Sequence, residues 1–277
     1  MFEFLYGLPD VYLMIVLNAV FIGTSIIAVF LVRRFIPFDT RYRENSVIGN
    51  ISSVISIIYG VLAGLMALYL MNNIGTASDA VLKESNALAN LYRDSLWLSK
   101  PTRGDIDKKI IEYINTVAND EWPLMAKGQR VGEFGSQLID DITHDLILYN
   151  ARNNSENLLI HDMLDEIKTL YNARKERIQM SYVELNPDIW VVIVIGTLLI
   201  IVVNYLFGMH FYLHIVSMVA ISIMASSMIF LLITLDKPFQ GSFVIDTSQY
   251  LEVRDRIEKN MQPQTQNKGA KSGKAIT

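Results

Sequence analysis

The chain has 277 residues, of which 51% are apolar and 19% are charged, and its formal net charge is -4. It contains no cysteine, which excludes disulfide bonds, iron-sulfur clusters, thiolate nucleophiles and cysteine-ligated zinc. Because this many charged side chains coexist with a high apolar content, the apolar residues must be clustered along the chain.

Four long apolar runs account for the clustering, at residues 11–32, 47–71, 189–209 and 211–235. Each reaches about 20 residues, the length that an α-helix needs to cross roughly 30 Å of hydrocarbon. None contains Asp, Glu, Lys or Arg, each of which would cost about 2.5 kcal/mol or more in lipid. No basic residue precedes the first run, so we expect a membrane span there and not a cleaved signal peptide. The sequence predicts an all-α membrane protein with four transmembrane helices in two hairpins.

The soluble part, residues 73–188, holds 19 acidic and 13 basic residues, and this acidic balance argues against nucleic acid as a partner. Apolar residues recur there at helical spacing over 77–98, from Thr102 or Asp105 toward Trp122, over 138–153 and over 156–178. Pro101 is expected to end the first of these helices, and residues 127–135, with three glycines, are expected to form a loop. Four antiparallel helices are therefore expected to form a small bundle, and the second span is free to continue into the first of them.

The predicted organisation has five parts. Residues 1–72 form a first transmembrane hairpin, residues 73–188 a helical soluble domain, and residues 189–235 a second transmembrane hairpin. A post-membrane segment follows at residues 236–261, with an amphipathic stretch near Tyr250 to Ile257. The polar residues 262–277 are expected to form a disordered tail.

The orientation in the membrane is not decided by charge. The loop between the first two spans holds Arg33, Arg34, Arg41 and Arg43, which the positive-inside rule places in the cytoplasm together with that loop. Basic residues also flank the opposite membrane junctions, including Lys83 and Lys237. Both orientations therefore stay open on charge alone.

A stripe of small residues runs along the second span for nearly the whole crossing. Two uses fit it: a narrow water-filled path lined by small and hydroxyl side chains, or close packing against another helix, which is the commoner use in lipid. The two are compatible, because a pore helix in an oligomer also packs on its neighbours. The stripe consists of Gly49, Ser53, Ser56, Gly60, Ala63 and Ala67.

Other polar groups offer little chemistry. Asn18, Asn50 and Asn204 lie inside spans and are expected to form hydrogen bonds between helices. His210 and His214 have the four-residue spacing of metal ligands, but no carboxylate lies near them in sequence, so we expect no metal site and no cofactor.

The sequence also predicts no enzyme. Asp120 and Glu121 are adjacent and thus on different helix faces, which suits a structural helix end better than an acid and base pair. No phosphate-binding glycine loop, nucleophile elbow or zinc-protease motif is present.

Several short strings, in an order that covers roughly residues 1–250, together resemble the bestrophin-like family of four-span membrane proteins. The resemblance implies a likeness to bestrophins, which are pentameric, anion-selective channels with two helical hairpins, a helical cytosolic region and a pore lined by span two. It favours a cytoplasmic soluble domain. The strings are Val32-Arg33-Arg34, Ile58-Tyr59-Gly60-Val61-Leu62, Asp120-Glu121-Trp122-Pro123, Tyr205-Leu206-Phe207-Gly208 and Leu235-Asp236-Lys237-Pro238-Phe239-Gln240-Gly241.

The resemblance also implies a pore constriction. Bestrophins narrow their pore with three large apolar residues four apart on span two, and the corresponding positions here are Ile57, Val61 and Leu65. The aromatic rings typical of the animal channels are absent from these positions. In bestrophins an acidic calcium-binding cluster follows the Pro-Phe-x-Gly string, whereas here Asp246 is the one acid nearby, so calcium gating is not carried over.

Two functions follow as hypotheses. The first is an oligomeric anion channel of the inner or plasma membrane, a homo-oligomer that is a pentamer by resemblance, with small ions passing along span two. The second is a non-conducting membrane scaffold or signalling anchor that recruits a partner through the acidic helical domain or the basic tail. A continuous wet path on a symmetry axis would distinguish the first from the second.

Overall fold

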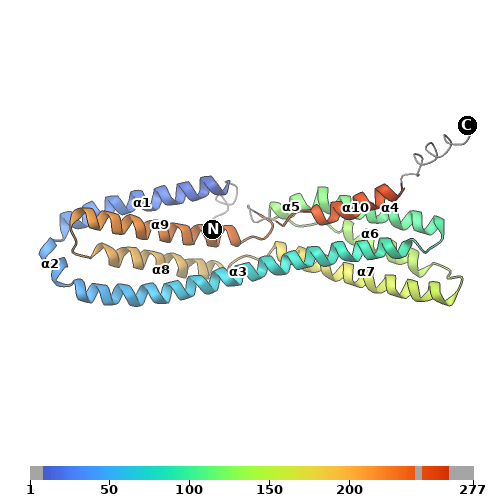
Figure 1. Cartoon of the computed structure of the whole chain (residues 1–277), viewed down its shortest axis with the longest axis horizontal. Coiled ribbons are helices and arrows are strands. Elements are labelled where there is room, and N and C mark those ends of the chain that lie inside the picture. Colours follow the sequence, from blue (N-terminus) through green and yellow to red (C-terminus); the bar gives the residue numbers. More distant parts are fainter. Residues whose placement is uncertain (1–8, 241–244, 262–277) are drawn as a thin grey trace, which may run out of the picture. The chain divides into compact units, whose positions relative to one another are not determined.

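The protein, seen in a computed structural model, is described over residues 9–240 and 245–261, and its regular elements there are helices (Figure 1). They group into two compact units. We call Met1–Ala77 with Met180–Ile245 the membrane unit, and Ser78–Gln179 with Asp246–Thr277 the helical unit. The expected disordered tail, residues 262–277, lies outside the described residues.

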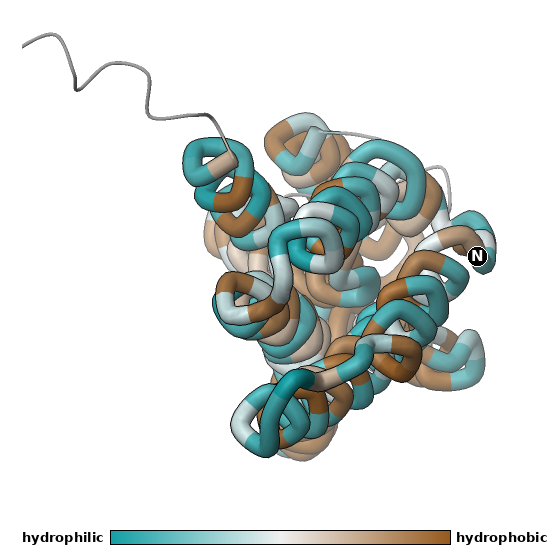
Figure 2. Tube along the Cα trace, turned by 90° about the vertical axis from the view of Figure 1, so that its right-hand side faces the viewer, coloured by the Kyte–Doolittle hydropathy of each residue, from teal (hydrophilic) through white to brown (hydrophobic). Residues whose placement is uncertain are grey.

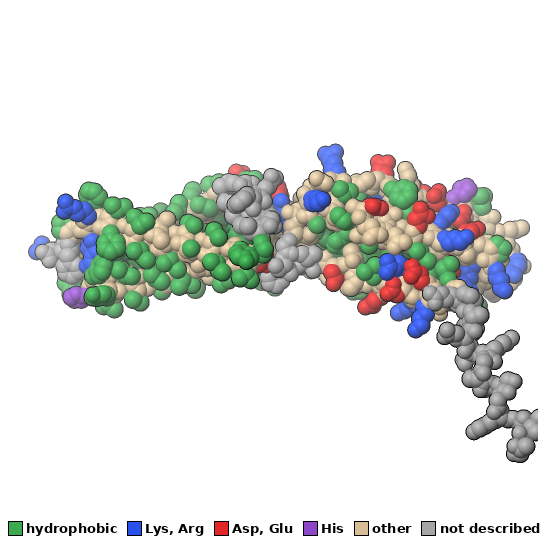
Figure 3. Space-filling view, turned by 90° about the horizontal axis from the view of Figure 1, so that it is seen from above, with side chains coloured by type: hydrophobic (Ala, Val, Ile, Leu, Met, Phe, Trp, Pro, Cys, Tyr) green, Lys and Arg blue, Asp and Glu red, His purple; other side chains and the backbone are tan. Residues whose placement is uncertain are grey.

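The membrane unit confirms the four predicted spans. Its helices are α1 (Asp10–Phe35), the short α2 (Phe38–Arg43), the first part of α3 (Asn45–Ser95), α8 (Pro187–Tyr205) and α9 (Phe211–Leu235). All except α2 are long and apolar enough to cross a membrane. On the face seen in Figure 3, hydrophobic side chains are spread along the length of the unit, as expected of a surface that faces lipid.

The third span begins at Pro187, at the place where this proline was expected to start it, but it ends before the apolar run of 189–209 does. α8 begins at Pro187, which suits a first helical turn because its missing N–H would have no partner there. The Asn186 side chain caps the helix by accepting a hydrogen bond from the Asp188 N–H at 2.9 Å. The helix ends at Tyr205, and residues 206–210 form the turn that leads into α9.

Packing within the membrane unit centres on α9, which lies along α1 and also contacts α8. The core is apolar and includes Leu13 of α1, Leu70 of α3, Trp190 and Ile193 of α8 and Leu232 of α9, each at most 3% exposed. α3 gives little of its spanning surface to this core. Most of that surface is consequently left for lipid or another subunit.

The helical unit contains the end of α3, which is one unbroken helix of 51 residues, as the sequence allowed. It continues with α4 (Lys100–Thr116), a π-helical turn η1 (Val117–Glu121), α5 (Trp122–Ala126), α6 (Phe134–Ile147), α7 (Asn154–Ser181) and α10 (Ser248–Met261). Hydrophilic and hydrophobic positions alternate around the turns of the helices in Figure 2, as amphipathic packing requires.

The unit departs from the predicted bundle in four places. α6 begins at Phe134, inside the loop predicted over 127–135, and ends at Ile147, before the predicted limit of 153. α4 begins at Lys100 and not after Thr102, because Pro101 fits the first turn of the new helix instead of only ending the old one. The π-helical turn was not predicted. The amphipathic stretch near Tyr250 forms α10, which packs on α4 and adds a further helix to the bundle.

Candidate functional site

The three predicted constriction residues lie on one face of α3. Their spacing of four places them one above the other, and Ile57, Val61 and Leu65 are 66%, 60% and 55% exposed on the membrane unit. Other large apolar side chains of α3 that are exposed, such as Val54 and Leu68, flank this row. The membrane unit thus presents a continuous apolar face, centred on the row, that its own helices do not cover.

The stripe of small residues lies on an adjacent face of α3. Ser56, Gly60 and Ala63 of the stripe line a largely apolar groove of about 590 Å³ that Thr197 of α8 and Met224 of α9 also line. Each of Ser56 and Gly60 directly precedes a row residue, which rotates it by about 100° around the helix. The stripe and the row therefore occupy different faces of α3: Ala63 of the stripe is buried and its Ser56 and Gly60 border the groove, whereas the row points outward.

Polar contacts hold α3 to α8 at two depths. The Tyr59 hydroxyl lies 2.8 Å from Thr197 Oγ1, and Asn204 Nδ2 donates to Ser52 Oγ at 3.1 Å. Between α1 and α9, Ser226 Oγ donates to Asn18 Oδ1 at 3.0 Å. The predicted use of Asn18 and Asn204 in hydrogen bonds between helices is confirmed.

Gly196 of α8 permits the close approach of α3, because a Cβ at this position would lie 2.5 Å from Cδ2 of the Tyr59 ring. We expect Gly196→Ala to displace the ring and to destabilise the membrane unit by about 1 to 2 kcal/mol through overpacking. Equilibrium unfolding of the purified protein in detergent measures the change. Gly64→Ala, where nothing lies within 4 Å of the added Cβ, serves as the matched control. Equal stability of the two variants would contradict the tight contact.

The turn between α8 and α9 is held by side chains from three other helices. Arg33 Nη2 donates to the Met209 carbonyl at 3.0 Å, and Arg41 Nη1 donates to the Phe207 carbonyl at 3.1 Å. Asn45 bonds Gly208 twice, donating to its carbonyl at 3.0 Å and accepting from its N–H at 2.8 Å. We call Arg33, Arg41 and Asn45 the turn clamp.

The two histidines predicted not to bind metal differ in their surroundings. His210 is exposed, whereas His214 is fully buried near Arg33 and Arg41. Among the described residues, no group of three histidine or acidic side chains is placed to hold a metal ion.

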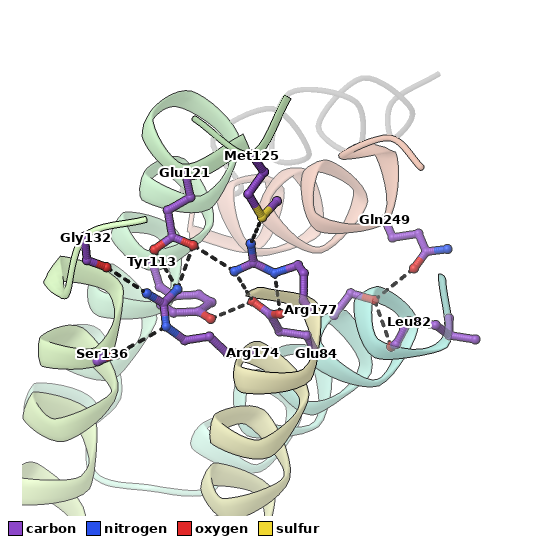
Figure 4. Close-up of polar contacts among 11 residues, drawn as sticks. Leu82, Glu84, Tyr113, Glu121, Met125, Gly132, Ser136, Arg174, Arg177 and Gln249 are labelled. Carbon is purple, nitrogen blue, oxygen red and sulfur yellow. Dashed lines mark hydrogen bonds and ion pairs between the residues drawn. The ribbon is translucent and has the colours of Figure 1, made fainter. Parts of the chain in front are cut away.

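Four buried charges form the polar centre of the helical unit (Figure 4). Arg177 Nε donates to Glu84 Oε2 at 2.7 Å, and Arg177 Nη2 donates to Glu121 Oε2 at 2.8 Å. Arg174 Nη1 lies 2.6 Å from Oε1 of Glu121. All four side chains are at most 4% exposed. Two acids and two bases thus balance, and we call these residues the ion cluster.

The residues around the ion cluster bury it and hold its side chains in place. The Tyr113 hydroxyl donates to Glu84 Oε1 at 2.6 Å, and burial together with the Glu84 carboxylate raises the pKa of Tyr113. Burial alone would lower the pKa of Arg177, but the attraction and hydrogen bond of Glu84, together with Tyr250 and Tyr113, raise that pKa well above its usual value. A Cβ on Gly135 would lie 2.6 Å from Arg174 Nη1, so the absence of a side chain there makes room for the cluster. Because each of the four side chains is buried and paired, the arrangement is that of a structural core.

Sequence reasoning missed the ion cluster, although it assigned Glu121 to a structural helix end. The π-helical turn places Glu121 inside and leaves Asp120 exposed. A signal was present in α7, because Arg174 and Arg177 continue the steps of three and four set by the buried residues Met163, Ile167 and Leu170.

Comparison with known proteins decides the family. A family model for the Bestrophin-like domain matches residues 19–250, which is most of the chain. The chain belongs to the Bestrophin-like family. This confirms the resemblance found in the sequence strings.

Solved structures share the Bestrophin-like fold at low identity. Two point variants of a bacterial bestrophin homologue from Klebsiella pneumoniae match with TM-scores of 0.68 and 0.65 and identities of 12% and 10%. The matches cover 88% and 89% of this chain and 99% and 98% of those chains. A structure of the homologue obtained by zinc phasing matches at a TM-score of 0.64 and 11% identity, covering 88% of this chain and 97% of that one. A search of curated protein sequences finds no match.

The strings that carry the Bestrophin-like resemblance include residues at close contacts. Arg33 belongs to the turn clamp and Gly208 to the turn that it holds, Tyr59 packs on Gly196, and Glu121 belongs to the ion cluster. Asp236, from the string after α9, accepts a hydrogen bond from the Leu185 N–H at 2.6 Å. These strings therefore mark positions where distant parts of one unit meet.

Proposed function

We propose that this Bestrophin-like protein is a homo-oligomeric ion channel that conducts anions, with α3 lining the pore. The observation that carries the proposal is the uncovered row of Ile57, Val61 and Leu65. Each is more than half exposed on a helix that gives little of its spanning surface to its own unit. Facing a symmetry axis, three stacked rings of large apolar side chains would form a narrow neck that gates by losing water.

A pore between subunits fits the interior of the membrane unit better than a pore through it. The described core is filled by apolar side chains such as Leu13, Ile193 and Leu232. Its buried hydroxyls bond one another or backbone carbonyls, as Thr197 does with the Ile193 carbonyl at 2.9 Å. Conduction then requires a closed ring of subunits around a shared axis.

The groove beside α3 supports the same arrangement. It lies on the face next to the row, so another subunit that packs against the groove leaves the row free to face the axis. The stripe of small residues then serves packing and the row serves the pore. We take the pentameric state, the preference for anions, the plasma-membrane location and the cytoplasmic position of the helical unit from the likeness to bestrophins.

The test is to reconstitute the purified protein in liposomes and to record single-channel currents under a chloride gradient. We expect discrete currents that reverse near the chloride potential. In Leu65→Ala we expect a larger unit conductance or a higher open probability, because the truncation widens one apolar ring.

Leu198→Ala on α8 is the matched control. Leu198 is 54% exposed and Leu65 is 55% exposed, so the two truncations remove the same side chain from equally exposed positions. Leu198→Ala is expected to conduct as the wild type does. Equal effects of the two variants would contradict a pore lined by α3. The absence of currents from a correctly folded oligomer would contradict the channel function itself.

A non-conducting scaffold is the second candidate, and exposed apolar side chains on the helical unit favour it. Trp97 is 74% exposed in the turn after α3, and Ile147 and Leu148 are 65% and 69% exposed at the end of α6. Large apolar side chains on a water-facing surface can dock a partner protein. A sealed oligomer in which Trp97→Ser abolishes a stable, stoichiometric complex with an identified partner would favour the scaffold over the channel.

A further inference from the structure

The turn clamp leaves several buried nitrogen atoms without an acceptor. Arg33 Nη1 and Arg41 Nε have no hydrogen-bond partner, although their neighbouring nitrogens bond carbonyls of the turn. Neither ring nitrogen of His214 has a partner in good hydrogen-bond geometry, although the Asn204 backbone lies close to the ring, and this side chain is 0% exposed. Unpaired buried donors are rare because each costs about 1 to 3 kcal/mol, and more when the group is charged.

These groups form one positively charged cluster. Arg33 and Arg41 both reach the turn at residues 207–209, and burial together with the nearby Arg33 lowers the pKa of Arg41. The other groups that face them are the Asn45 amide, the carbonyls of the turn, the Asn204 backbone beside His214, and the Phe211 ring, which lies 5.1 Å from Arg33 Cζ. Of the carboxylates that the structure describes, none forms an ion pair with Arg33 or Arg41. The charge of this cluster is therefore uncompensated within the described part of the chain.

The cluster lies at the ends of spans. Arg33 is in the last turn of α1 and His214 is in the first turn of α9, which places both at the depth where phospholipid headgroups meet a spanning helix. Charged side chains gather at this end of the membrane unit in Figure 3, beyond its hydrophobic belt. Arg33 is half-buried, which gives the cluster contact with the surface on that side.

We propose that Arg33, Arg41 and His214 bind a phosphate group. A phosphate supplies the missing negative charge and enough acceptor oxygens for two guanidinium donors and one imidazole N–H. Two sources share this chemistry: the headgroup of an anionic phospholipid and free inorganic phosphate. The binding does not depend on whether the protein conducts ions.

The experiment measures the thermal stability of the purified full-length protein in a neutral detergent against three added probes. These are phosphatidylglycerol, inorganic phosphate balanced with chloride at equal ionic strength, and diacylglycerol, which has no phosphate. A ligand that binds the folded state raises the melting temperature with its concentration. Stabilisation by phosphatidylglycerol alone identifies a lipid headgroup, and stabilisation by inorganic phosphate identifies a free anion. Stabilisation no greater than with diacylglycerol overturns the proposal.

Variants test the named residues. His214→Leu removes a ring that makes no hydrogen bond of good geometry within the protein, so we expect normal folding and an affinity for the phosphate probe lower by about tenfold or more. Arg41→Gln is expected to lose at least as much, and also some stability because the Phe207 bond goes with it.

Arg34→Gln is the matched control, since it removes an equal charge from an exposed side chain next to Arg33. Its affinity is expected to equal that of the wild type. An equal loss in Arg34→Gln and His214→Leu would show attraction by net charge and not a built site. Unchanged affinity in His214→Leu and Arg41→Gln would likewise overturn the proposal.

Discussion

Arg177→Ala is expected to destabilise the helical unit by about 3 to 5 kcal/mol, the cost of removing one partner from a buried ion pair. The substitution leaves Glu84, which is 0% exposed, with the Tyr113 hydroxyl and without its cation. It also takes away one of the two arginines that face Glu121. The measurement is urea unfolding of the purified protein in detergent, followed by fluorescence, because the Trp122 ring lies 5.8 Å from Arg177 Cζ.

Two further variants separate lost charge balance from lost packing. Lys168→Ala breaks an exposed pair with Asp165, where water replaces the lost partner, and is expected to change stability little. The double variant Glu84→Leu with Arg177→Met removes one acid and one base together. It is expected to be more stable than Arg177→Ala, because no buried charge is left alone. A wild-type unfolding curve for Arg177→Ala would contradict the role assigned to the ion cluster.

Gly208→Ala is expected to destabilise the membrane unit by about 3 kcal/mol, near the upper end of overpacking effects. A Cβ on this residue would lie 2.4 Å from the Tyr42 backbone nitrogen and 2.6 Å from its Cα. Backbone atoms cannot turn aside as a side chain can, so α2 or the turn has to move. That movement pulls on the hydrogen bonds between Asn45 and Gly208.

Thermal unfolding in detergent, together with the oligomer size on gel filtration, measures the effect of Gly208→Ala. The matched control is Gly23→Ala in α1, where nothing lies within 4 Å of the new Cβ. That variant is expected to be neutral or slightly stabilised, since alanine suits a helix better than glycine does. Normal assembly and stability of Gly208→Ala would show that the close approach at the turn is dispensable.

Sequence reasoning was strongest where a single local property decides the structure. The four spans follow from uninterrupted apolar length, and the continuation of α3 to Ser95 follows from the lack of a helix breaker after the second run. It was weaker at other helix ends, because Pro101 lies in the first turn of α4 where it was expected only to end the helix before it. A proline stops one helix and starts another with the same chemistry.

Contacts between distant residues were out of reach. Arg33 and Met209 are 176 residues apart, and nothing in the loop charges distinguishes Arg33, which holds the turn, from the exposed Arg34. Two arginines of this loop, Arg33 and Arg41, thus hold the turn between α8 and α9. Their presence is therefore a weaker guide to the orientation of the protein in the membrane. The sequence likewise did not show that the row at Ile57, Val61 and Leu65 and the stripe of small residues lie on different faces of the unit, because this depends on where the neighbouring helices pack. The pore role of either set stays a prediction.

The turn clamp forms its hydrogen bonds with the peptide backbone of the turn and not with the side chains of the turn. Its acceptors are the carbonyls of Phe207, Gly208 and Met209, which every amino acid carries. These hydrogen bonds therefore do not depend on which side chains occupy positions 207 and 209. At position 208, in contrast, any side chain would clash with the Tyr42 backbone, so only glycine fits. In related sequences, substitutions in this turn should occur at positions 207 and 209, whereas Gly208 should be retained.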